Sequence, residues 1–122
     1  KKFIDETRGK GAIPVVCSSI VRRHFDTSGN LLDSHGDYVK AAKEVALETK
    51  TVYIDMEALT RKVVFEMGPV KSKEIYNFIG KRQDSTHLNV KGAKLVAELF
   101  VKEVKRKKIP LASLLKSEED KH

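Results

Sequence analysis

The sequence predicts an α/β fold in which helices flank a parallel sheet. Two short apolar runs rich in Ile and Val, at residues 12–17 and 51–54, have the character of buried strands. An amphipathic helical pattern separates them, which gives the strand, helix, strand order of a parallel crossover. A long apolar stripe over residues 93–104 predicts a further helix against the sheet. These three observations favour a layered α/β arrangement.

Glycine and proline residues indicate where the first helix ends and where the first strand begins. Residues 2–8 have the pattern of a helix, which the glycines that follow should end. The strand over residues 12–17 comes next, and Pro14 should lie at its first residues or face away from a neighbour, because proline cannot donate to a sheet ladder. The single cysteine, Cys17, cannot form an intramolecular disulfide and is expected in the core.

A polar loop over residues 18–37 leads to the second helix, and residues 26–30 within it have turn chemistry. Asp37 can supply an N-cap oxygen to that helix. The residues expected on its buried face recur at spacings of three and four and are Tyr38, Ala41, Ala42, Val45 and Ala46.

Two more amphipathic helices follow the second strand. Asp55 is expected to cap the first of them, Gly68 and Pro69 to end it, and a short helix to begin at Ser72. Asn89 is expected to cap the long helix, whose lysine-rich outer side we interpret first as a solvated surface. The apolar residues of these stripes are Met56, Leu59, Val63 and Met67, then Ala93, Val96, Ala97, Phe100, Val101 and Val104. Residues 117–122 are expected to fray.

The strand count is too small for a complete sheet. One pair of strands can be recognised, whereas sheets usually hold about 4 to 6 strands. The chain has 122 residues, starts without methionine and begins inside a helical pattern. We therefore expect residues 1–122 to form a single partial domain, whose free strand edge pairs with a missing N-terminal half or with a second copy of the chain.

Composition narrows the classes of partner. Lys and Arg number 24 against 17 Asp and Glu, a formal net charge of +7 that favours polyanions. The basic residues are spread over helix surfaces without interleaved aromatic side chains, so nucleic acid is not expected as a partner. No apolar stretch is long enough for a membrane span, and no cofactor is expected.

Asp84 and His87 are candidates for acid–base chemistry. They lie three residues apart just before the long helix, so that the carboxylate can orient the imidazole. In a hydrolytic triad the histidine accepts the proton of the nucleophile and the aspartate fixes the ring tautomer. The spacing also fits a purely structural arrangement, in which Asp84 caps a turn and His87 lies at a helix entrance.

Several blocks of the sequence, in order along nearly the whole chain, resemble the SGNH or GDSL-like hydrolases, and in particular their rhamnogalacturonan acetylesterase branch. The final block of that superfamily resembles residues 84–89 together with Gly92 and Ala93. The upstream blocks that point to the branch are residues 11–15, 22–26, 29–31, 33–38, 54–55, 68–73 and 109–112. Several blocks in the right order are far harder to obtain by chance than one short motif.

The resemblance implies the C-terminal part of a flavodoxin-like three-layer α/β/α sandwich, incomplete as given. It implies a carboxylic ester hydrolase that removes acetyl groups from pectic polysaccharide through Ser, His and Asp, in a parent protein that is secreted or periplasmic. The aspartate and histidine of the family fall on Asp84 and His87. Its nucleophilic serine and its oxyanion-hole Gly and Asn have no counterpart here, so this chain alone is expected to be inactive. The alternative is a non-catalytic module that binds polyanions or polysaccharide and retains the hydrolase shell.

Three further groups of residues are candidates for a binding, nucleophilic or metal-ligating role. Arg22, Arg23 and His24 follow the first strand and are candidates for binding the carboxylates of an acidic polysaccharide. Equally, the two arginines could pair with aspartates of the same loop. The less favoured candidates are Ser18 and Ser19 as replacement nucleophiles, for which no nucleophile elbow is present, and Asp33, His35 and Asp37 as a metal site, for which a turn is the simpler interpretation. No metal is expected.

Overall fold

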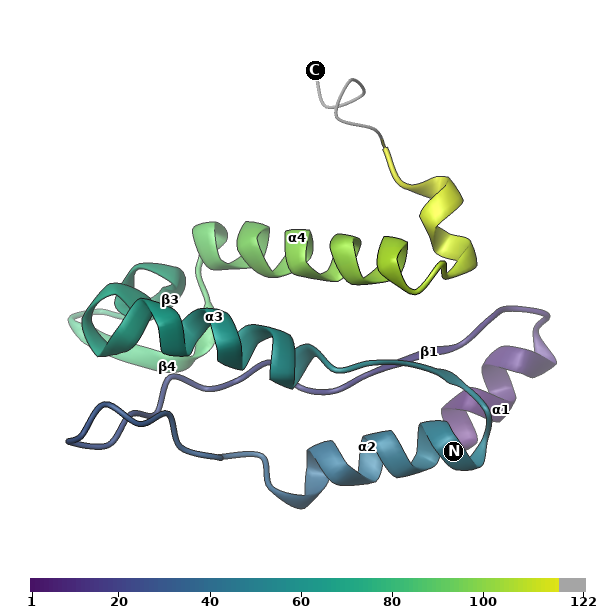
Figure 1. The fold of residues 1–122 in the computed structure, drawn as a ribbon, viewed down its shortest axis with the longest axis horizontal. Coiled ribbons are helices and arrows are strands. Elements are labelled where there is room, and N and C mark those ends of the chain that lie inside the picture. Colours follow the sequence, from purple (N-terminus) through teal and green to yellow (C-terminus); the bar gives the residue numbers. More distant parts are fainter. Residues whose placement is uncertain (117–122) are drawn as a thin grey trace.

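The computed structural model describes residues 1–116, so the expected fraying of residues 117–122 lies outside the described residues. Helices and short strands alternate along the chain, which confirms the α/β class (Figure 1). The elements are α1 (Lys2–Gly9), β1 (Val15–Cys17), α2 (Asp37–Glu48), β2 (Val52–Ile54), α3 (Met56–Lys71), the 3-10 helix η1 (Ser72–Ile75), β3 (Tyr76–Ile79), β4 (Arg82–Leu88), α4 (Val90–Arg106) and the 3-10 helix η2 (Pro110–Leu114). No helix among the described residues is long and apolar enough to cross a bilayer.

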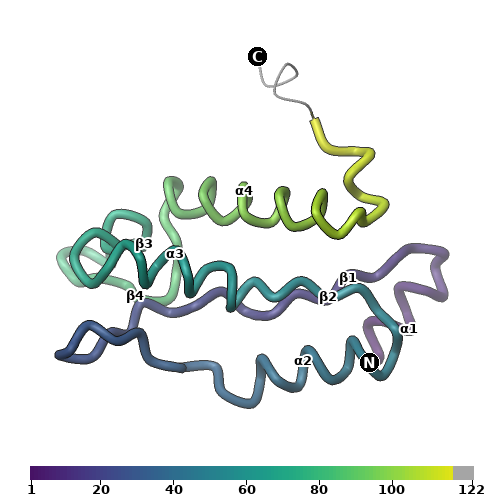
Figure 2. The backbone as a smooth tube through the Cα atoms, viewed as in Figure 1, coloured from purple at the N-terminus to yellow at the C-terminus, as the bar shows by residue number. Residues whose placement is uncertain are grey.

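β1 and β2 form the expected parallel pair. Val15 lies opposite Val52, and Cys17 lies opposite Ile54. Pro14 immediately precedes β1, where its missing N–H removes nothing from the ladder. In Figure 2 the two strands run side by side between α2 and α4. The strand pair is thus the middle layer of an α/β/α arrangement.

Two apolar clusters hold the layers together. One joins β2 to α4 and the segment after it, and its buried members are Ile54, Met56, Val104 and Ile109. The other joins the loop after β1 to α3 and to the start of β3, and its buried members are Val21, Val64, Ile75 and Tyr76. The hydroxyl of Tyr76 donates to the carbonyl oxygen of Val21 at 2.5 Å, so this second cluster also contains a satisfied polar contact.

An antiparallel hairpin lies between η1 and α4, where no strand was expected. β3 pairs with β4, Tyr76 lies opposite Leu88 and Ile79 lies opposite Arg82. Gly80 makes the tight connection with a φ of +62°, a conformation that glycine adopts without strain. The part of the chain that the structure describes therefore contains two strand pairs, and the expectation of a single pair was wrong.

The helix ends confirm two expected caps and correct a third. The side chain of Asp55 accepts a hydrogen bond from Ala58 N, and that of Asn89 accepts one from Gly92 N. Asp37 does not cap α2, because it is the first helical residue and Gly36 occupies the cap position.

The break in α3 and the short helix after it lie where the sequence predicted them. Gly68 breaks α3 with a φ of +78°, as expected, although a further helical turn continues to Lys71. The 3-10 helix η1 begins at the expected residue, Ser72.

Three expectations about burial were wrong. Cys17 is exposed rather than in the core, because within residues 1–116 no strand lies beside the outer edge of β1. Tyr38 is 82% exposed and Ala41 is also exposed, although α2 packs on β1 and β2 and buries Ala46. Ala93 and Ala97 are also exposed, because α4 turns other residues of its stripe inward.

Candidate active site

Asp84 and His87 form a directly hydrogen-bonded pair on β4. Nδ1 of His87 lies 2.8 Å from Oδ2 of Asp84. The carboxylate is largely enclosed, with 11% of its side chain exposed, whereas 77% of the imidazole is exposed. The Nε2 atom of His87 makes no hydrogen bond to any group of the described residues. This arrangement anchors one ring nitrogen and leaves the other open to solvent.

The backbone around Asp84 holds its carboxylate in place. Oδ1 accepts hydrogen bonds from the N–H groups of Thr86, at 2.8 Å, and of His87, at 3.2 Å. The amide of Thr86 is the largest influence that lowers the pKa of Asp84, and the His87 ring is the next. Asp84 is therefore a carboxylate at neutral pH. Because the backbone occupies one of its oxygens, the other is left for the imidazole.

The dyad lies near the edge of the sheet where β1 ends. The backbone N–H of Arg23, in the loop after β1, donates to the carbonyl oxygen of Ser85 at 2.8 Å. Figure 1 shows β4 at the end of the molecule toward which β1 runs. Ligand sites of parallel α/β sheets form beyond the carboxyl ends of the strands. Asp84 and His87, with its exposed ring, therefore lie at the edge of the sheet where such sites form.

The three basic residues of the loop after β1 have different surroundings. The Arg23 guanidinium donates to the carbonyl oxygen of Pro69 and lies 5.9 Å from the centroid of the Phe25 ring. Arg23 therefore ties the loop to the break in α3. Arg22 is partly buried, and His24 is exposed beside the hairpin. Neither side chain makes a hydrogen bond to another described residue, and the Nε atom of Arg22 is buried without a partner.

The expected alternative, in which these arginines pair with aspartates of the loop, was wrong. No ion pair joins Arg22 or Arg23 to a carboxylate within residues 1–116. Asp26 instead accepts hydrogen bonds from Asn30 and from the backbone of Ser28. The side chain of Asn30 and backbone amides thus order the loop. Its arginines form no ion pair with its aspartates within residues 1–116.

Among the remaining candidates, Ser18, Asp33 and His35 have structural partners, whereas Ser19 is exposed. Ser18 donates to Oδ1 of Asp55 at 2.9 Å, so its hydroxyl is part of the cap of α3. The Asp33 carboxylate accepts from the backbone N–H of His35, whose ring lies 2.7 Å from the carbonyl oxygen of Ile20. Within the described residues, no three His, Cys, Asp or Glu side chains gather closely enough to hold a metal ion. Asp33 and His35 therefore belong to a turn, and Asp37 begins α2.

Two supporting residues were missed in the sequence. Tyr76 packs beneath the loop after β1, and Gly92 lets α4 approach the carbonyl group of Ile75. Both contacts join segments far apart in the chain, so no local pattern indicated them. Together they fix the loop, the hairpin and α4 around the dyad.

Comparison with known proteins supports the resemblance. The chain is 34% identical over 128 aligned residues to "Rhamnogalacturonan acetylesterase RhgT" of Bacillus subtilis, covering 98% of this chain and 55% of that protein. It is 31% identical over 111 residues to "Probable rhamnogalacturonan acetylesterase YesY" of the same organism, covering 91% of this chain and 51% of that protein. The chain thus spans about half the length of the curated relatives it matches. No family model matches it.

A solved structure has the same fold over most of the chain. The crystal structure of the Bacillus subtilis protein YxiM superposes with a TM-score of 0.76 at 26% sequence identity, covering 89% of this chain and 30% of that one. The sequence similarity to RhgT covers 98% of the chain and so includes both the parallel strand pair and the dyad-bearing hairpin. Over nearly its whole length the chain is thus similar to a rhamnogalacturonan acetylesterase and to a probable one, as its motifs indicated.

Proposed function

We propose that this chain carries the acid–base half of a carbohydrate esterase that removes acetyl groups from rhamnogalacturonan-type pectic polysaccharide. The observation that supports the proposal most is the Asp84–His87 pair, with its 2.8 Å hydrogen bond and its exposed second ring nitrogen. The names of the two curated relatives give the substrate class. The nucleophilic serine and the oxyanion donors lie, in this proposal, in a polypeptide segment outside this sequence.

The chemistry assigned to the pair is that of a general base and its orienting carboxylate. His87 Nε2 accepts the proton of the serine hydroxyl as the serine oxygen bonds to the acetyl carbon. The same proton then passes to the departing sugar oxygen, which leaves an acetyl-serine. A water molecule, activated by His87, releases acetate and restores the serine. Throughout, Asp84 keeps the Nδ1–H in place and stabilises the imidazolium.

The polymer substrate carries carboxylates, and the loop of Arg22, Arg23 and His24 is the proposed place for them. Arginine suits bidentate contact with carboxylate. Because Arg23 is engaged with Pro69 and Phe25, we assign the carboxylate contact first to Arg22 and His24. Replacing either residue should raise KM for the acidic polymer more than KM for a small neutral aryl acetate.

The test compares this chain alone with the chain co-expressed with the segment of RhgT that lies outside the matched region. The chain alone should hydrolyse acetylated rhamnogalacturonan at a background rate, because a base without a nucleophile has little to activate. The co-expressed pair should be active. His87→Ala should lower kcat by about 10⁴-fold or more, and Asp84→Asn by a similar factor, because each removes one member of the triad.

Asp37→Asn is the matched control for Asp84→Asn. It makes the same isosteric change at an exposed carboxylate, which accepts no hydrogen bond from the described residues. Its activity should equal that of the unaltered pair. Turnover by the chain alone that survives His87→Ala would contradict the proposal. An inactive complex that still binds the polysaccharide would favour a non-catalytic binding module.

A further inference from the structure

The dyad lies in an interruption of the hairpin ladder. The register of the two strands shifts between Tyr76 and Phe78 of β3. Between the partners of these two residues, β4 has the four residues 84–87, whereas β3 has only Asn77. Such a β-bulge re-aims side chains and leaves part of the backbone without ladder partners. We call residues 84–87 the dyad bulge.

Contacts from outside the ladder hold two of the three peptide groups within the dyad bulge. The carbonyl oxygen of Ser85 accepts a hydrogen bond from the backbone N–H of Arg23 at 2.8 Å. The N–H groups of Thr86 and His87 both donate to Oδ1 of Asp84. These bonds fix the second and third peptide groups of the bulge. The first peptide group, between Asp84 and Ser85, needs a different partner.

The side chain of Gln83 supplies that partner. Its Nε2 donates to the carbonyl oxygen of Asn77 at 2.8 Å and to that of Asp84 at 3.3 Å. Because Asn77 is the residue of β3 that faces the dyad bulge, the amide bridges the two sides of the interruption. Only the NH2 group of a glutamine side chain donates, so two carbonyl acceptors identify this atom as the nitrogen. Oε1 of Gln83 is buried and has no donor within residues 1–116, so the two donor bonds are the polar contacts of this amide.

The exposure of the two dyad side chains makes their contact dependent on the backbone. The imidazole of His87 is 77% exposed, so little packing fixes its plane, whereas the side chain of Asp84 is only 11% exposed. The orientation of the ring therefore follows from Asp84, and the position of that carboxylate follows from its own backbone. A reacting group has to be held within about 0.5 Å of its productive position.

We propose that Gln83 is a positioning residue for the dyad. By tying the carbonyl group of Asp84 to that of Asn77, its amide aligns Oδ2 of Asp84 with Nδ1 of His87. This inference rests on the proposed function, in which His87 is the base. Without the amide, the first peptide group of the dyad bulge is free to rotate. The carboxylate then turns away from the ring, and the Nδ1–H tautomer loses the acceptor that favours it.

Nitrogen NMR of the chain alone, recorded where the ring is neutral, tests the proposal through the ratio of the Nδ1–H to the Nε2–H tautomer of His87. Gln83→Met keeps the length of the side chain and removes both donor bonds. It should lower this ratio at least about threefold, because the Asp84 acceptor is no longer aligned. An unchanged ratio overturns the proposal even where the urea midpoint falls, because a purely structural role would lower only the stability of the fold.

A double variant tests whether Gln83 acts through Asp84. In the Asp84→Asn background, Gln83→Met should not lower the tautomer ratio further, because the carboxylate that it aligns is already gone. A further fall of the same size would show that Gln83 acts independently of Asp84 and would overturn the proposal. If Gln83→Met fails to fold, Gln83→Asn takes its place. This variant keeps the amide but is one CH2 group too short to reach both carbonyls, and the same fall in the ratio is expected.

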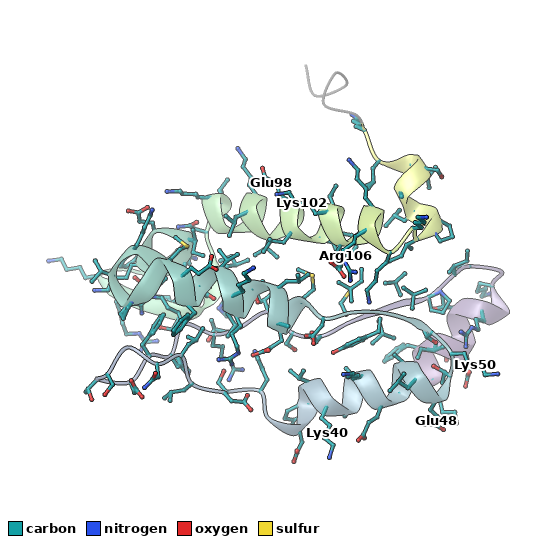
Figure 3. All side chains as sticks on the ribbon, in the orientation of Figure 1. Lys40, Glu48, Lys50, Glu98, Lys102 and Arg106 are labelled. Atoms are coloured by element: carbon teal, nitrogen blue, oxygen red, sulfur yellow. The ribbon has the colours of Figure 1, made fainter. Side chains whose placement is uncertain are left out.

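Two control variants separate the amide of Gln83 from its surroundings. Asn77→Ala removes an exposed side chain and keeps the carbonyl group that Gln83 binds. Lys102→Met introduces the same methionine at an exposed position in the C-terminal half of α4, which Figure 3 shows away from the hairpin. Both controls should leave the tautomer ratio unchanged. A fall in either control as large as that in Gln83→Met would overturn the assignment to this amide.

Kinetics of the complex with the unmatched segment of RhgT separate this role from the proposed function. Gln83→Met should lower kcat by about tenfold or more and leave KM within about twofold, because misplacing a reacting group slows the chemistry without changing the polymer contacts. A raised KM with an unchanged kcat overturns the proposal. An inactive unaltered complex, with a tautomer ratio that Gln83→Met still lowers, contradicts the esterase and upholds the role of Gln83. An active complex in which Gln83→Met changes neither the ratio nor kcat upholds the esterase and overturns that role.

Discussion

Replacing Gly92 with alanine should force α4 away from the segment that precedes the hairpin. A Cβ atom at Gly92 would lie 2.0 Å from the carbonyl oxygen of Ile75 and 3.0 Å from its carbonyl carbon. Ile75 is 1% exposed, and the same carbonyl accepts a hydrogen bond from Asn89 N at 3.1 Å. The obstacle is therefore buried backbone, which cannot swing aside as a long side chain could. α4 must shift by about 1 Å before the contact reaches even 3.0 Å.

The energetic terms of Gly92→Ala oppose one another. Alanine gains at most about 1 kcal/mol over glycine in a helix. Overpacking costs about 1–3 kcal/mol, and a lost hydrogen bond at a buried carbonyl costs about 1–3 kcal/mol more. We expect the free energy of unfolding to fall by about 1–3 kcal/mol. At about 1–3 kcal/mol per molar urea, the unfolding midpoint should fall by about 1 M.

Urea unfolding followed by circular dichroism measures this change, with Gly9→Ala as the control. A Cβ at Gly9 meets no atom within 4 Å, and the residue does not have a positive φ. Gly9→Ala should stay within about 0.5 kcal/mol of the unaltered chain. Equal midpoints for the two alanine variants would refute the close approach of α4 to Ile75.

Three further predictions concern stability. Burial raises the pKa of Tyr76 to about 12. The contribution of Tyr76 to the free energy of unfolding is therefore full below the unfolded pKa of 10 and is lost as the pH rises toward 12. Tyr76→Phe should abolish that alkaline loss and cost about 1–3 kcal/mol at pH 7, because the Val21 carbonyl loses its donor. The pKa of Asp84 is lowered in the folded chain. The contribution of Asp84 to the free energy of unfolding is therefore present above the unfolded pKa of 3.8 and is lost as the pH falls below that value. The stability difference between the unaltered chain and Asp84→Asn should therefore narrow in acid, as urea titrations at several pH values would show. Asp55→Ala should cost about 0.5–2 kcal/mol in the same assay, because the N–H of Ala58 loses its cap.

The parts of the fold that could be predicted from the sequence are governed by local rules. The parallel crossover follows from two β-branched runs around an amphipathic helix, and the caps at Asp55 and Asn89 follow from side chains that reach backbone only three residues away. The hairpin escaped prediction because Arg82–Leu88 is polar on both faces and has no alternation. Its pairing depends on the turn at Gly80 and on Tyr76, which is anchored to a distant loop.

In the candidate site, too, the local contacts could be predicted from the sequence and the long-range contacts could not. The three-residue spacing of Asp84 and His87 was enough to predict their contact, since backbone geometry brings such side chains together in a turn. The hydrogen bond from Arg23 to the carbonyl oxygen of Pro69 joins residues 46 positions apart in the sequence, so no local pattern predicts it. The exposure of Cys17 depends on the lack, within residues 1–116, of a second strand beside β1, which no local pattern could indicate.

The tautomer of His87 tests the central assignment most directly. In a triad the base needs its proton on Nδ1 and a bare Nε2. Nitrogen NMR of the chain, recorded where the ring is neutral, should show the Nδ1–H tautomer dominating, and Asp84→Asn should reduce its share. A dominant Nε2–H tautomer, or a distribution that Asp84→Asn leaves unchanged, would contradict the assignment of Asp84 and His87 as orienter and base.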